Sequence, residues 1–221
     1  MLDPGHGGFD PGAVNNVTGS QEKDIVLAVC KKIQNFLTPD VEVVLSRSSD
    51  LFLSLSKRAF KANEFNVDRF LSIHCNSAEN PAANGFEIFT TKGKTRSDKF
   101  ATAIYNRFKG LGPKERKDTS DGDPDKEAQF TVLTKTAMPA ALLELEFIHN
   151  SRGSDWLSNS NNQQQMARSI ADGILDDFGI THTVEPPHTS EPPQVGEDTS
   201  SILARMEEDL AVLRKRFPWT S

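Results

Sequence analysis

Apolar residues recur with helical spacing in several stretches of the chain. In residues 22–37, Ile25, Val29 and Ile33 fall on one side of a helix, and Pro39 would end it. The same period predicts further helices over residues 53–65, 97–108 and 163–178.

Shorter apolar runs between these helices have the length and composition of strands. They are VEVVL (41–45), RFLSIHCN (69–76), GFEIFTT (85–91) and ALLELEF (141–147). A very short first strand is expected to end at Leu2. Because strands alternate with helices, we predict an α/β fold with a mostly parallel twisted sheet, helices on both faces and a single domain.

The composition divides the chain into three parts. Residues 1–180 hold all the elements above and should form the folded domain, in which polar residues 112–128 should be a long surface loop. Residues 181–201 are rich in proline and poor in apolar side chains, which predicts an extended linker. Residues 202–221 carry an apolar seam typical of a short amphipathic helix. A helix this short is marginal alone, so we expect self-association or docking through it.

Charge and composition argue against several classes of function. The 221 residues carry a net charge of −6 and no stripe of basic residues, so nucleic-acid binding is not expected. No run of about 18 apolar residues predicts a membrane span, and no signal-peptide pattern is recognisable at the start. Cys30 and Cys75 are expected to be buried free thiols.

Four polar residues lie where an α/β sheet gathers its functional groups, near the carboxyl ends of strands. His6 follows the first strand in DPGHGGFDPGA, His74 closes LSIH, Glu144 lies in ALLELEF, and Glu22 begins the first helix. Two imidazoles and a carboxylate are a zinc ligand set that leaves a position open for water. The glycines around His6 let the loop turn tightly and approach another group.

Six motifs occur in the order of a known family. DPGHGG with PGA is followed by the helix-start glutamate, SRSSDLFLSLSKRAFKAN, LSIHCNS, GFEIF and VLTKTAMPAALLELEFIHN. Over about residues 2–178 the chain resembles the zinc-dependent N-acetylmuramoyl-L-alanine amidases of the amidase-3 family. The resemblance implies that His6, Glu22 and His74 bind Zn²⁺ and that Glu144 is the catalytic glutamate.

The same resemblance implies a substrate and a place of action. The substrate would be peptidoglycan, cut between N-acetylmuramic acid and L-alanine at the bacterial cell wall. The absence of a signal pattern, the linker and the small C-terminal part favour a phage endolysin over a trimmed autolysin. Two rivals are a zinc carboxypeptidase acting on the stem peptide and an inactive wall-binding or regulatory module. The presence of all four site residues argues against the inactive module.

Each candidate residue also has an ordinary structural explanation. His6 could be a loop histidine, His74 a satisfied core histidine and Glu144 an isolated buried carboxylate. Glu22 could stand at its position because acids are favoured at helix N-termini.

Neighbouring residues have expected roles in support. Arg47 and Arg58 match family positions and are expected to serve packing and salt bridges. Asp3 or nearby carbonyls could orient the imidazole of His6. Cys75 alternates away from the histidine before it and is expected in the core. The remaining histidines are expected to be solvated or peripheral: His149, His182 and His188.

Two features depart from the family pattern. A small residue usually follows two positions after the catalytic glutamate, whereas this chain has Glu146. On a regular strand Glu146 would share a face with Glu144 and could raise the pKa of one of the two carboxyls. Alternatively it pairs with a cation such as Arg152. The first strand is also short, because only Met1 and Leu2 precede the opening motif.

Overall fold

The computed structural model describes residues 1–38 and 40–181. Within these residues a five-stranded sheet has the order β1-β2-β5-β3-β4. The strands are β1 (Leu2–Pro4), β2 (Phe70–Asn76), β3 (Glu87–Thr90), β4 (Lys126–Glu127) and β5 (Ala140–Phe147). The helices are α1 (Glu22–Leu37), α2 (Leu55–Glu64), α3 (Arg96–Phe108), α4 (Thr131–Thr134), α5 (Ser151–Ser158) and α6 (Ser160–Phe178).

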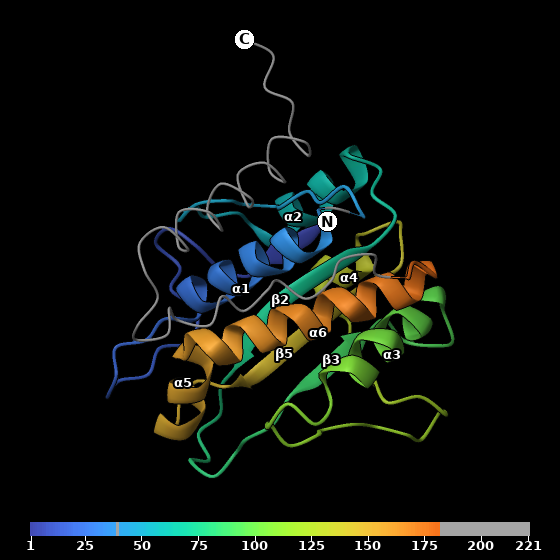
Figure 1. Ribbon diagram of the computed structural model, residues 1–221. Coiled ribbons are helices and arrows are strands. Elements are labelled where there is room, and N and C mark those ends of the chain that lie inside the picture. Colours follow the sequence, from blue (N-terminus) through green and yellow to red (C-terminus); the bar gives the residue numbers. More distant parts are fainter. Residues whose placement is uncertain (39, 182–221) are drawn as a thin grey trace, which may run out of the picture. The chain divides into compact units, whose positions relative to one another are not determined.

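The sheet is mostly parallel, as predicted. Strands β1, β2 and β5 run in the same direction, whereas β3 pairs with β5 in the antiparallel sense and β4 runs parallel to β3. The carboxyl ends of β1, β2 and β5 therefore meet at one edge of the sheet, where the loop after β1 and the start of α1 also lie (Figure 1).

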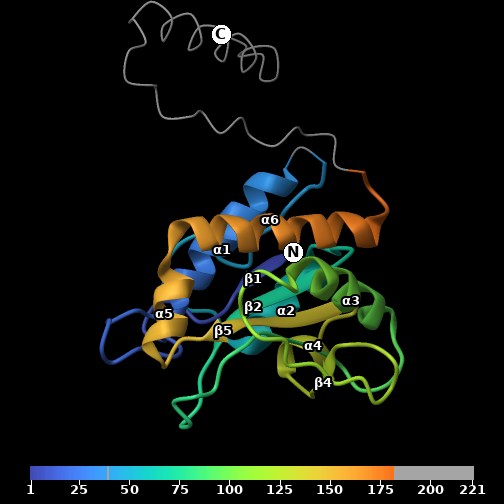
Figure 2. The ribbon, with the colours of Figure 1, turned by 60° about the horizontal axis from the view of Figure 1, so that its bottom comes forward.

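Helices cover both faces of the sheet, which confirms the predicted layers. Figures 1 and 2 show α1, α3 and α6 packed across one face, with α2 and α4 on the other. The larger core lies under α1, α3 and α6 and includes Ile33, Ile73 and Ile170. The smaller core lies under α2 and α4 and includes Phe70 and Leu142. No helix in the described part of the chain is both long and apolar enough to cross a membrane.

The strand predicted over residues 41–45 is wrong. Leu45 forms only an isolated bridge to Leu2, with Leu2 N donating to the carbonyl of Val44 and Ser46 N donating to that of Leu2. Because β1 is three residues long, it offers too little edge for a further strand. The apolar residues of this segment instead pack partly buried against the larger core.

Other differences are smaller. Helices α4 and α5 are too short for their period to show in the sequence. Helix α6 starts at Ser160 rather than 163, since the Asn159 side chain accepts hydrogen bonds from the first amides of the helix. The expected loop 112–128 includes strand β4 at its end. The expected linker, apart from Thr181, and the C-terminal helix lie outside the described residues.

Candidate metal centre

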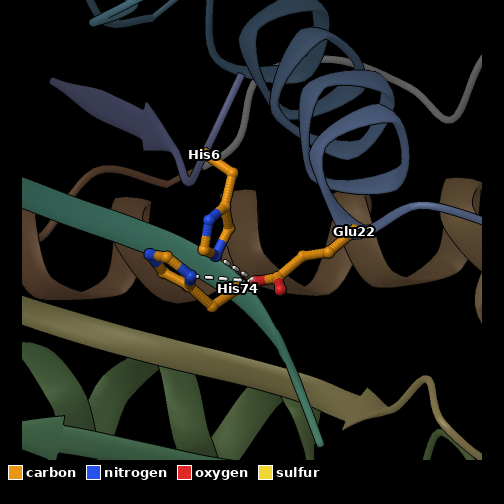
Figure 3. A group of neighbouring side chains, drawn as sticks. All are labelled: His6, Glu22 and His74. Atoms are coloured by element: carbon orange, nitrogen blue, oxygen red, sulfur yellow. Dashed lines mark hydrogen bonds and ion pairs between the residues drawn. The ribbon is translucent and has the colours of Figure 1, made fainter. Parts of the chain in front are cut away.

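Three side chains from three separate elements converge at the carboxyl edge of the sheet. His6 comes from the loop after β1, Glu22 is the first residue of α1, and His74 lies on β2 (Figure 3). Glu22 Oε1 is 3.2 Å from His6 Nε2 and 2.9 Å from His74 Nδ1. One ligand atom from each residue lies within 4.8 Å of the others, so the three could hold one metal ion.

The loop that carries His6 is shaped by its glycines. His6 has a positive φ of 57°, and Gly7 and Gly8 continue in the same half of backbone space. A Cβ on Gly5 would lie 2.2 Å from His74 Cε1, and one on Gly12 would lie 2.6 Å from Glu22 Oε2. Gly12 approaches the His6 ring equally closely, so the two glycines are needed for close approach to all three site residues.

Two buried arginines fix this loop through hydrogen bonds to its backbone carbonyls. Arg47 donates to the carbonyls of Pro4 and Gly5, and Arg58 donates to those of Pro4 and His6. Arg58 also forms the expected salt bridge: its Nη1 lies 2.9 Å from Oδ1 of buried Asp3. Arg47 forms no ion pair with a described residue, so its role here is to satisfy loop carbonyls.

The residue that orients His6 is Asp10 rather than Asp3. Asp10 Oδ2 lies 2.9 Å from His6 Nδ1, which leaves Nε2 directed at Glu22. Asp3 instead binds Ser46, Ser72 and the guanidinium below the loop. A carboxylate that accepts the Nδ1 proton fixes the ring and raises the basicity of the other nitrogen.

The carboxylate of Glu22 and the two imidazoles shift one another's pKa values in the metal-free protein. Burial raises the pKa of Glu22, but hydrogen bonds from His6 and His74 outweigh it and hold the pKa well below its usual range. Burial lowers the pKa of His6, but its bonds to Glu22 and Asp10 raise the pKa to about 9. His74 is shifted upward by Glu22 in the same way, against the effect of burial, so its pKa is also raised. An ionised carboxylate thus lies between two imidazoles and favours the protonated form of each.

Glu144 lies beside this group on the neighbouring strand. It is in register with His74, and in-register partners project from the same face of a sheet. Its Oε2 is buried and has no hydrogen-bond partner among the described residues. The pKa of Glu144 is raised to about 7, mainly by burial; the charge of His74 opposes this shift, and the charges of Glu22 and Glu87 add to it.

Glu87 is a neighbour that the sequence analysis missed. It lies on β3 directly opposite Glu144 and binds Arg116, Lys126 and the amide of Asn76. Glu87 is the polar residue in the apolar strand GFEIF, which could have marked it as a candidate. Only the strand order, however, places it next to the site.

The expectations for Glu146 are wrong on both counts. The register between β2 and β5 shifts, so that Asn76 faces Phe147 and β5 carries one extra residue, a β-bulge. Phe147 therefore takes the face of Glu144, and Glu146 is turned away from it. Glu146 Oε1 accepts hydrogen bonds from Gly85 N and Phe147 N, and no ion pair joins it to Arg152 or to any other described residue.

The thiols and the remaining described histidine lie outside the cluster. Cys30 and Cys75 are buried and free, as predicted, and burial raises the pKa of both thiols. His149 bonds to the backbone of Ala78 and Asn80 in a loop. The predictions for His182 and His188 lie outside the described residues.

A family model for N-acetylmuramoyl-L-alanine amidases, Amidase_3, matches residues 1–176, a range that contains all four site residues. The chain belongs to the Amidase_3 family. This family is zinc-dependent, and the two imidazoles and one carboxylate are donors that suit Zn²⁺. Beside them, Oε2 of Glu144 is buried and has no hydrogen-bond partner among the described residues, so it can bind a further group in the site.

Curated relatives include both phage and bacterial enzymes. The endolysin of Bacillus phage SPP1 is 38% identical over 184 residues, covering 79% of this chain and 64% of that protein. The sporulation-specific N-acetylmuramoyl-L-alanine amidase of Bacillus subtilis is 35% identical over 188 residues, covering 83% of this chain and 69% of that protein. The chain therefore spans about two thirds of the length of these relatives.

Solved structures share the fold. The catalytic domain of the amidase CwlV from Paenibacillus polymyxa superposes with a TM-score of 0.75 at 33% identity, covering 81% of this chain and 97% of that domain. An N-acetylmuramoyl-L-alanine amidase from Clostridium difficile 630 gives a TM-score of 0.75 at 32% identity, covering 80% of this chain and 95% of that one. The Amidase_3 domain thus accounts for the architecture described above.

Proposed function

We propose that this amidase domain hydrolyses the amide bond between N-acetylmuramic acid and L-alanine in peptidoglycan. His6, Glu22 and His74 are its zinc ligands, and Glu144 is its general base. The observation that carries the proposal is the convergence of two imidazoles and a carboxylate within 4.8 Å, next to a carboxyl whose pKa is raised to about 7. Membership of the Amidase_3 family supports the reaction class.

The ligands and Glu144 have different tasks. Zinc, when bound, lowers the pKa of a water molecule towards about 7 and polarises a carbonyl oxygen. Glu144 accepts a proton from the attacking water and passes it to the leaving amine of L-alanine. A carboxyl with a pKa near neutrality suits both halves of this transfer, since it can accept and then release the proton.

The surroundings of Glu144 prepare it for this role. Glu87 on one side is held by Arg116 and Lys126, so negative charge is fixed next to the carboxyl. His74 lies on the other side and opposes that charge. The basicity of Glu144 therefore depends on its two strand neighbours as well as on burial.

We also propose that the protein is an endolysin-type lysin rather than an autolysin. The likeness to the SPP1 endolysin supports this, although the amidases of Bacillus subtilis are of similar identity. Purified protein added to isolated walls should lower their turbidity, and expression inside a bacterium with a separate pore-forming protein should cause lysis. Wall hydrolysis in vitro without lysis in that experiment would contradict the endolysin assignment and leave the amidase assignment intact.

Mass spectrometry of digested peptidoglycan tests the reaction. We expect fragments with a free amine on L-alanine and glycan with an intact lactyl group, and both should disappear when a chelator is added. Release of a terminal amino acid from the stem peptide would instead indicate a carboxypeptidase. Unchanged walls in the presence of stoichiometric zinc would indicate a binding module.

A further inference from the structure

Glu146 is a buried carboxylate that the proposed reaction does not use. Its side chain is 6% exposed. Gly85 N and Phe147 N donate to Oε1 at 2.6 and 2.7 Å, so this oxygen is fixed. Oε2 accepts no hydrogen bond from any described residue. Oε2 is not among the buried side-chain atoms without a partner, so this oxygen is accessible and can accept a hydrogen bond from a ligand.

The bulge in β5 directs Glu146 into a cavity separate from the metal centre. This cavity has a volume of about 370 Å³, and neither the metal-ligand residues nor Glu144 line it. It is bounded by Glu146 at the end of β5, by α5, and by residues 112–114. Residues 112–114 are fixed next to the start of β3, because Phe86 N donates a hydrogen bond to the carbonyl of Lys114 at 2.9 Å.

Two glycines allow close packing around residues that line the cavity. Gly85, which donates to Glu146, has a φ of 114°, and a Cβ there would lie 2.3 Å from the Lys114 carbonyl oxygen. Gly112 has a φ of 134° and approaches the Trp156 indole so closely that a Cβ would lie 3.2 Å from Nε1. A side chain at either glycine would therefore displace a residue that lines the cavity.

The cavity is also lined by a cation without a partner among the described residues. Arg152 on α5 lines it and forms no hydrogen bond or ion pair through its side chain with a described residue. The Trp156 indole N–H also lines the cavity without an acceptor among the described residues. Lys114 and Asp155, both exposed, stand at the rim. The cavity is thus lined by both a carboxylate, on Glu146, and an exposed guanidinium, on Arg152.

We propose that this cavity binds a zwitterionic amino-acid group, with its ammonium against Glu146 Oε2 and its carboxylate against Arg152. A simple anion would be repelled by Glu146. A metal ion would find only one buried carboxylate. A guanidinium can hold a carboxylate through two parallel hydrogen bonds. The volume is in the range of small-molecule sites and exceeds what one amino acid needs.

The same ligand chemistry occurs in free amino acids and at the amino-acid ends of wall peptides. The site goes beyond the proposed amidase reaction, because it needs neither zinc nor Glu144. A peptide bound here would be a second point of attachment to the wall, and a free amino acid would be a small-molecule effector.

Nuclear magnetic resonance of the full-length zinc-loaded protein tests the proposal. The indole N–H of Trp156, assigned with Trp156→Phe, is the reporter. The probes are D-alanine, its N-acetyl derivative, its amide, and a soluble stem tripeptide ending in diaminopimelate, which carries a free zwitterion. We expect D-alanine or the tripeptide to shift the resonance in a saturable way, and the two derivatives of D-alanine to bind about tenfold more weakly or worse.

Substitutions assign the two contacts. Glu146→Gln keeps an oxygen for Gly85 N and Phe147 N, and Arg152→Gln keeps a polar surface, so both should fold. Each should weaken binding by about tenfold or more, whereas Arg96→Gln, at another exposed arginine, should not.

The outcomes separate cleanly. Binding of D-alanine alone indicates a free amino acid, and binding of the tripeptide indicates a wall peptide; either supports the zwitterion site. No saturable shift with either probe, or equal binding by Glu146→Gln and wild type, would overturn it. Because the measurement is binding, neither result depends on whether the protein cleaves peptidoglycan.

Discussion

Both oxygens of Glu22 are held by backbone amides, independently of any metal. Ala13 N donates to Oε2 at 2.8 Å and Cys75 N donates to Oε1 at 2.9 Å. The carboxylate is therefore fixed between the loop after β1 and strand β2, and the imidazoles of His6 and His74 meet at a position that the backbone has already set. Such preorganisation reduces the side-chain entropy lost when a metal binds.

Substitution of Glu144 should separate metal binding from catalysis. Glu144→Gln keeps the shape of the side chain but cannot accept the proton, so turnover should fall by about two to four orders of magnitude while zinc is retained. Glu146→Gln should cause a far smaller loss, because the bulge turns this residue away from the site. Turnover on a soluble muramoyl peptide and elemental analysis would check both. Equal losses from the two variants would show that the carboxyls act together.

Zinc binding should release protons at pH 7. The pKa of His6 is raised to about 9, so this imidazole is protonated in the metal-free protein at this pH, and the raised pKa of His74 favours its protonated form as well. Zinc binds neutral imidazole and must displace the bound protons, at least about one per metal. Affinity should therefore rise with pH up to about 9. Calorimetry in buffers of different ionisation enthalpy measures the release, and identical enthalpies in all buffers would refute it.

At the level of elements, the conformation of the loop after β1 depends on its glycines and on the hydrogen bonds that Arg47 and Arg58 donate to it. Gly5 is not at a positive φ, so its requirement for glycine comes from the approach of His74. Gly173 on α6 is a useful comparison, since a Cβ there would lie 2.6 Å from Ile104 Cα on α3. One glycine serves the site and the other serves helix packing.

Alanine at these two positions should therefore have different effects. Gly5→Ala should displace His74 and weaken zinc binding by about tenfold or more, the scale seen when support for a metal ligand is lost. Gly173→Ala should lower the free energy of unfolding by about 1–3 kcal/mol through overpacking, with little change in zinc affinity. Chemical denaturation and zinc titration of both variants would test this. The same profile for both would mean that the loop is not specifically adapted to the site.

The elements also show what a sequence can and cannot predict. The helical periods of α1 and α3 and the short apolar runs of β2 and β5 are local features of the sequence, and the structure confirms these elements. Strand order depends on long-range packing: β5 inserts between β2 and β3, which brings Glu87 next to Glu144. The bulge that redirects Glu146 likewise exists only in the pairing of two strands.

At the scale of the whole molecule, the described core and the candidate site lie within residues 1–180. The buried apolar residues from Leu2 to Leu175 form the two described cores around the sheet, and all four site residues belong to the same part. A version ending at Ile180 should therefore keep its zinc and its turnover on soluble fragments.

Light scattering and thermal unfolding of the full chain and of this version test the remaining prediction. If residues 202–221 cause self-association, the full chain should have the mass of an oligomer and the shortened version that of a monomer. Monomers in both cases, with the shortened version inactive, would instead give the C-terminal part a role in folding or catalysis.

The central claim is that His6, Glu22 and His74 hold the zinc on which amide hydrolysis depends. The most direct measurement is zinc content and L-alanine amine release on the same samples of wild type, chelated wild type, His6→Ala and His74→Ala. We expect stoichiometric zinc and turnover in wild type alone, with added zinc restoring the chelated wild type but neither variant. Stoichiometric zinc in both variants, or continued turnover by the chelated protein, would contradict the claim.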